Sequence, residues 1–235
     1  MDKPVCLVTG VGPEHGTGAE IARRFCEGGY KVAMLARDAD RLASLEAKYE
    51  DARAYPCDVA DIDALVDTVA RVREEMGAPS VVVHNALRSV RGGILELDPV
   101  DLERNFRVNT TALLHLARET LPSMLEAGKG AILVTGNTSA TRGKTNWGFF
   151  ASTKAAQRIL AESMAREFGP QGIHVAHVIV DGFILSERHA KVAAERPEDA
   201  LLEPDEIAAE YVHLYQQHRS AWTQELDLRP WTEKF

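Results

Sequence analysis

The chain has 235 residues, of which 45% are hydrophobic and 26% charged, as is typical of a soluble globular protein. This length fits one medium domain, so we expect residues 1–235 to form a single domain. The formal net charge of -8 argues against nonspecific binding to nucleic acid or to an anionic membrane.

The spacing of the cysteines and the lengths of the apolar runs indicate which sites and segments the protein lacks. Cys6, Cys26 and Cys57 are far apart in the sequence and form no CxxC pair, which favours buried thiols over disulfides or a metal site. No apolar run approaches the ~20 residues that a membrane helix needs, and the first residues lack the pattern of a signal peptide. We therefore expect a cytoplasmic protein without a metal centre.

Apolar runs and helical periodicities alternate from the first residues to the last. The predicted strands are 4–10, 30–37, 52–59, 79–86, 130–137, 172–182 and 221–230. The predicted helices are 18–29, 38–50, 61–76, 99–127 with an interruption at Pro122, 147–168 and 204–217. Residues 183–202 show no clear pattern. The alternation predicts an α/β fold, a doubly wound parallel sheet with helices on both faces.

A glycine-rich stretch, "TGVGPEHGTG", lies between the first predicted strand and the first predicted helix. Gly10, Gly12, Gly16 and Gly18 allow a tight turn and a close approach of the backbone to a pyrophosphate. The following helix N-terminus offers free N–H groups and a positive dipole end. The alternative is an ordinary glycine-rich turn, but the position directly after the first strand favours a dinucleotide site.

The second predicted strand ends in "MLAR", which places Arg37 where an NAD-preferring site often has an acid. A guanidinium suits the 2′-phosphate of NADP(H), because it forms charge-assisted, bidentate hydrogen bonds. Asp38 is the next residue, and we interpret it as a helix N-cap rather than as a ribose ligand. We predict NADP(H) as the cofactor, with NAD(H) as the alternative.

Taken together, the motifs resemble the short-chain dehydrogenase/reductase family over essentially the whole chain. The matching pieces are the glycine stretch, "CDV" at 57–59, "HNAL" at 84–87, "NFRVNTTA" at 105–112, Lys154 with its helix, and "VIVDGFI" at 178–184. The resemblance implies a Rossmann-type sheet of about seven strands in the order 3-2-1-4-5-6-7. It also implies a homodimer or homotetramer built on helices 99–127 and 147–168.

The resemblance carries roles over to matching positions of this chain. Asp58 would bind the adenine amino group, Asn85 would lie beside the adenosine ribose, and Lys154 would bind the nicotinamide ribose. Asn109 would hold a water in a proton relay, and the backbone at Ile184 would contact the carboxamide. The same cofactor site is expected to include Val59, Ala86 and Gly182.

Two positions depart from the family pattern where it carries out catalysis. Asn137 stands at the serine position and Phe150 at the tyrosine position, four residues before Lys154. Asn137 is able to donate a hydrogen bond to a developing oxyanion, but Phe150 has no proton to give. We expect the ring of Phe150 to face the nicotinamide from the same helix face as Lys154. The five tyrosines fall in elements predicted to be distant from this site.

Three functions remain open from the sequence. The favoured one is an NAD(P)H-dependent oxidoreductase for a small carbonyl, alcohol or imine substrate with an atypical proton donor, and residues 183–202 as a substrate lid. Candidate donors are Lys154, Glu187 and His189. The alternatives are a dinucleotide-binding protein without redox turnover, and a non-redox enzyme built on the same scaffold.

Overall fold

A computed structural model describes residues 3–234 and shows a seven-stranded sheet in which every neighbouring pair is parallel. The strand order is β3-β2-β1-β4-β5-β6-β7, which confirms the predicted topology. The strands are β1 Val5–Thr9, β2 Lys31–Ala36, β3 Ala52–Pro56, β4 Pro79–His84, β5 Gly130–Asn137, β6 Ile173–Val180 and β7 Glu225–Leu228.

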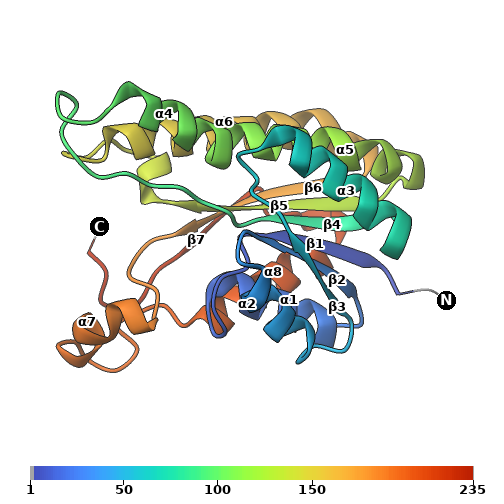
Figure 1. Ribbon diagram of the computed structural model, residues 1–235, viewed down its shortest axis with the longest axis horizontal. Coiled ribbons are helices and arrows are strands. Elements are labelled where there is room, and N and C mark those ends of the chain that lie inside the picture. The colour runs from blue at the N-terminus through green and yellow to red at the C-terminus, as the bar shows by residue number, and fades with distance from the viewer. Residues whose placement is uncertain (1–2, 235) are drawn as a thin grey trace.

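Helices cover both faces of the sheet, so that the central strands are buried on both sides (Figure 1). One layer holds α3 Ile62–Met76, α4 Pro99–Phe106, α5 Ala112–Ala127 and α6 Gly148–Phe168. The other holds α1 Thr17–Glu27, α2 Ala39–Glu46 and α8 Pro204–Gln216. Burial on both faces explains why the strands read as continuous apolar runs in the sequence.

Three of these helices have an aspartate as the N-cap residue. Asp38, Asp61 and Asp98 each accept a hydrogen bond from a backbone N–H in the first turn of the helix that follows. Such caps satisfy N–H groups that have no partner within the helix. The structure thus confirms Asp38 as the N-cap of α2.

The predicted helix 99–127 divides, but not at its proline. A π-helical turn, Arg107–Thr111, separates α4 from α5, while α5 continues through Pro122. Within this turn the side chain of Asn109 bonds to both backbone groups of Arg88, in the loop after β4. The irregular turn therefore brings the helix layer against the carboxyl end of the sheet.

The segment 183–202 has more structure than its sequence pattern predicted. It contains a 3₁₀ turn, Glu187–His189, and the short helix α7, Ala190–Ala194. Ile184 and Leu202 form an isolated parallel bridge that closes the base of the segment. In Figure 1 α7 lies at the lower left, away from both main helix layers. No described helix has the length and apolar character needed to span a membrane.

Candidate functional site

A cavity of about 1320 Å³ opens at the carboxyl ends of the strands, where the chain order reverses between β1 and β4. Ligands of doubly wound sheets bind at this topological switch point. Of the residues predicted from the sequence, the lining contains Gly10, Gly12, Gly16, Gly18, Arg37, Asp58, Val59, Asn85, Ala86, Asn137, Gly182 and Ile184. It does not contain Asn109, Phe150 or Lys154.

Two glycines of the loop have close contacts that leave no room for a side chain. Gly10 has φ +71°, and a Cβ there would lie 2.5 Å from the Cα of Ala86. A Cβ on Gly18 would lie 2.5 Å from the carbonyl oxygen of Gly10, whereas one on Gly12 would meet nothing within 4 Å. The loop is therefore packed tightly against the sheet at Gly10 and Gly18 and open toward the cavity at Gly12.

The N-terminus of α1 supplies hydrogen-bond donors at this loop. Its N-cap residue, Gly16, has no side chain with which to cap the first turn, and Gly16, Thr17 and Gly18 all line the cavity. Free N–H groups at a helix N-terminus bind phosphate groups. The residues present thus fit the pyrophosphate of a dinucleotide.

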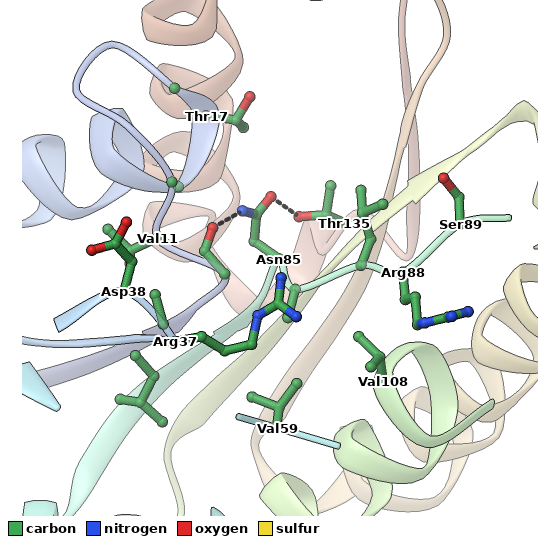
Figure 2. Close-up of a pocket in the computed structure, with 18 of the residues that line it drawn as sticks. Val11, Thr17, Arg37, Asp38, Val59, Asn85, Arg88, Ser89, Val108 and Thr135 are labelled. Atoms are coloured by element: carbon green, nitrogen blue, oxygen red, sulfur yellow. Dashed lines mark hydrogen bonds between the residues drawn. The ribbon is translucent and has the colours of Figure 1, made fainter. Parts of the chain in front are cut away.

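Asn85 ties the glycine loop to the central strands (Figure 2). Its Nδ2 donates to the carbonyl oxygen of Gly10 at 3.0 Å, and its Oδ1 accepts from Thr135 Oγ1 at 3.0 Å. Thr135 Oγ1 also lies 2.6 Å from the hydroxyl of Tyr211, a buried residue of α8 whose pKa burial raises. Tyr211 therefore lies one hydrogen bond from the cavity wall, closer than the sequence indicated.

The end of the cavity at β2 is lined by charged residues of both signs, Arg37, Asp38, Arg41 and Asp58. Figure 2 shows the side chain of Arg37 between Val59 and Asn85, and within residues 3–234 it makes no ion pair or side-chain hydrogen bond. Arg104 of α4 also lines the cavity without a carboxylate partner in the described structure. Sequence reasoning missed Arg104, although it precedes the lining residue Val108 by one helical turn.

At the opposite end, Asn137 is the polar side chain that ends β5. Its Oδ1 accepts a hydrogen bond from Ser139 N at 3.1 Å, at the start of the 3₁₀ turn Thr138–Ala140. This bond orients the amide and leaves Nδ2 as a donor beside the cavity. The neighbouring lining residues are Leu87, Arg88, Ser89, Val180, Gly182 and Ile184.

Phe150 and Lys154 lie side by side on α6 as expected, but the expected contact of Phe150 with the cavity is absent. Phe150 is buried and packs against Trp147, with ring centroids 5.9 Å apart. Lys154 is 1% exposed, and its Nζ donates to the carbonyl oxygen of Thr135 at 2.7 Å and to Gln157 Oε1. Both side chains are thus enclosed: Phe150 contacts another ring of the same protein, and Lys154 bonds to β5 and to α6.

Asn109, expected to hold a water, has protein partners for its polar atoms. Its side chain bonds to the backbone N–H and carbonyl of Arg88 at 2.9 Å and to Thr153 Oγ1 at 2.8 Å. Its carbonyl oxygen accepts from Gln157 Nε2 at 2.7 Å. Gln157, which the sequence analysis passed over, occupies the position between Asn109 and Lys154.

Burial shifts the ionisation of the groups around Lys154. It lowers the pKa of Lys154 to about 7. Burial, together with the nearby lysine charge, lowers the pKa of His84 on β4 and of His177 on β6 to about 4 each. Both imidazoles are consequently neutral near pH 7, and the amine titrates in that range.

Comparison with known proteins agrees with this fold and cavity. A family model described as short chain dehydrogenase matches residues 4–197. The cyclic-di-GMP-binding biofilm dispersal mediator protein of Escherichia coli is 34% identical over 166 residues, 70% of this chain and 68% of that protein. D-erythrulose reductase of Gallus gallus is 32% identical over 170 residues, 72% of this chain and 67% of that protein.

A solved structure extends the similarity to nearly the full chain. The crystal structure of a metagenomic short-chain oxidoreductase in complex with NADP has a TM-score of 0.84 and 26% identity. The match covers 98% of each chain.

Proposed function

The chain belongs to the short-chain dehydrogenase family, and we propose that it is an NADPH-dependent reductase of a small carbonyl or imine substrate. The observation that carries the cofactor preference is Arg37, an unpaired guanidinium at the β2 end of the cavity. A similar protein of solved structure binds NADP, which supports the same preference.

Different residues of the cavity would bind different parts of NADPH. The N–H groups of Thr17 and Gly18 would hold the pyrophosphate, and Arg37 the 2′-phosphate. Asp58, whose Oδ1 already accepts from Ala60 N at 3.0 Å, would bind the adenine amino group. When bound, the nicotinamide supplies a hydride.

The substrate end favours a reaction that needs little proton donation from the protein. Asn137 Nδ2 would donate to the oxyanion that develops from a carbonyl. The lining residues around Asn137 include no tyrosine, histidine or lysine within the described chain. An iminium substrate already carries its proton, so it depends less on a general acid than a ketone does.

The proposal also includes a substrate lid and an interface between copies of the chain. The segment 183–202 would act as a lid, because Ile184 at its base lines the cavity and Phe183 is 41% exposed. His189 does not line the cavity in the described structure, and its Nδ1 lies 2.8 Å from the carbonyl oxygen of Ile184. A homodimer or homotetramer through α5 and α6 would cover the exposed side chains of Leu114 and Ile159.

Calorimetry with NADPH and NADH tests the cofactor preference. We expect the parent protein to bind NADPH more tightly, and Arg37→Ala to weaken NADPH by about 1.5–3 kcal/mol, the contribution of a charge-assisted hydrogen bond. NADH affinity should stay constant. Arg53→Ala, which removes an exposed arginine paired with Glu75, is the control and should change neither affinity. Equal parent affinities for both nucleotides would refute the preference.

A second candidate is a dinucleotide-binding protein without redox turnover. The enclosure of Lys154 and Phe150 favours it, and so does the similarity to a relative named as cyclic-di-GMP-binding. The two candidates differ in NADPH oxidation with a panel of aldehydes, ketones and cyclic imines. Oxidation of any of them supports the reductase. Binding without oxidation, with cyclic di-GMP displacing NADPH, supports the second candidate.

A further inference from the structure

Gln157 occupies a central place between the sheet and the helix layer. Its side chain is fully buried on α6, one turn after Lys154. Its Oε1 accepts from Lys154 Nζ, and its Nε2 donates to the carbonyl oxygen of Asn109 at 2.7 Å. Both ends of the amide are therefore engaged by groups at the base of the candidate site.

We infer that Gln157 is a positioning residue that fixes the amine of Lys154 beneath the cavity and controls whether that amine carries a charge. The inference rests on the proposed function only where it gives Lys154 a role in cofactor binding. The hydrogen bonds themselves are independent of any bound nucleotide.

The amide orientation explains the control of charge. Asn109 offers only a carbonyl oxygen to Gln157, so the NH₂ group of the amide must face Asn109 and the oxygen must face Lys154. With the carbonyl oxygen of Thr135, the amine then has two neutral acceptors and no carboxylate. Neutral acceptors stabilise the ammonium form less than a carboxylate would, and burial opposes it.

A hydrogen-bonded path connects this amine to the cavity wall. It runs from Lys154 through Gln157 to the backbone of Asn109, whose side chain holds both backbone groups of Arg88. The guanidinium of Arg88, which lines the cavity, bonds in turn to Asn105 and Asp101. Gln157 consequently links the amine to the loop that forms one side of the substrate end.

Other titratable groups around Lys154 do not supply a compensating negative charge nearby. His84 faces it from β4 and His177 from β6, both with pKa lowered to about 4. Glu225 of β7 lies beyond His177, with its Oε2 3.3 Å from His177 Nδ1, and is bound by Arg158 of α6 at 2.5 and 2.9 Å. Gln157 is thus the side chain that most directly affects the charge of the Lys154 amine.

Two substitutions of opposite character test this inference. Gln157→Glu keeps the size of the side chain and places a carboxylate on the amine, but it also loses the donor to the carbonyl oxygen of Asn109. Gln157→Leu removes one of the two acceptors of the amine. NMR of the lysine side-chain nitrogen in the nucleotide-free protein, labelled with ¹⁵N-lysine, follows the titration of Lys154. The resonance is assigned by its absence in Lys154→Met.

We expect opposite shifts of the Lys154 midpoint. Gln157→Glu should raise it by about one pH unit or more, and Gln157→Leu should lower it. Thr120→Val, which removes a buried side-chain hydrogen bond on α5, is the control and should leave it unchanged. A merely structural role would lower the melting temperature without opposite shifts. An unmoved midpoint in Gln157→Glu, which is close in shape to the parent, or shifts of the same sign, would overturn the inference.

The pH dependence of NADPH affinity provides a second readout. In the parent, affinity should fall as the pH rises through the Lys154 midpoint, and Gln157→Glu should move this fall to higher pH. The effect of Gln157→Glu should vanish in a Lys154→Met background. Persistence of that effect without the lysine would also overturn the inference. Because the NMR titration uses no nucleotide, a failure of the proposed function leaves the first test intact.

Discussion

The two ends of the cavity are built in opposite ways. Around the glycine loop, Thr17, Gly18 and Arg37 line the cavity, and a side chain at Gly12 would meet nothing within 4 Å. Around α6, Phe150 and Lys154, which we expected at the family's acid and lysine positions, are enclosed. Phe150 packs on Trp147, and the amine of Lys154 is bonded to Thr135 and Gln157.

This difference sets groups suited to holding a dinucleotide apart from groups that have their partners inside the protein. A dinucleotide needs a close backbone approach and positive charge, which the first end offers. General acid catalysis needs a titratable group within reach of the reacting atom, and the cavity lining in the described structure holds no tyrosine, histidine or lysine. Three measurements address the contrast.

The largest expected effect comes from filling the packed part of the glycine loop. Gly10→Ala places a Cβ 2.5 Å from the Cα of Ala86 on a backbone with φ +71°, so strain and overlap act together. We expect a loss of about 3 kcal/mol or more in the free energy of unfolding, measured with urea. Gly12→Ala, in open space, should leave stability unchanged. Equal stability of both variants would show that the loop is not packed as described.

Phe150→Tyr examines the enclosed end. The new hydroxyl would be buried without a partner, which costs about 1–3 kcal/mol of unfolding free energy. Because Phe150 does not line the cavity, we expect no gain in ketone-dependent oxidation of NADPH. A stable variant with at least ~10-fold faster ketone reduction would instead place this position beside the substrate, since general acids supply ~10²–10⁴ in rate.

The smallest expected effect, taken over one pH unit, is a pH dependence that originates at the enclosed end. In the unfolded chain His84 binds a proton near pH 6.5, but in the fold only near pH 4. Between these values the unfolded state binds more protons, so stability is fully present above pH 6.5 and falls as the pH decreases toward 4. His84 should contribute about 1.4 kcal/mol of this loss per pH unit.

His84→Asn tests the assignment of that slope. Urea unfolding at pH 6 and pH 5 should show a smaller loss of stability in the variant than in the parent. His177 has a similarly lowered pKa and should retain its own share of the slope. Identical slopes in parent and variant would mean that His84 is not a source of the acid sensitivity.

Much of the architecture could be predicted from local sequence because local sequence encodes it. Continuous apolar strands, amphipathic helices and a glycine-rich turn are properties of neighbouring residues, so the α/β class and the position of the cavity followed from them, whereas the strand order came from the family resemblance. Asp38 as an N-cap was accessible for the same reason, since a cap acts on N–H groups of its own helix. The predicted glycines, Arg37 and Asn85 accordingly lie in the lining of the cavity.

The sequence did not determine which groups are enclosed. The break between α4 and α5 fell at the π-helical turn that holds Asn109, rather than at Pro122, and that turn is tied to the distant Arg88. Tyr211 reaches Thr135 across 76 residues of sequence. The amine of Lys154 meets Thr135 and Gln157 only because β5, α6 and the turn that holds Asn109 pack together. Such contacts arise only once the sheet and helix layers have packed, because hydrogen bonds between distant segments leave no periodic signal in the chain.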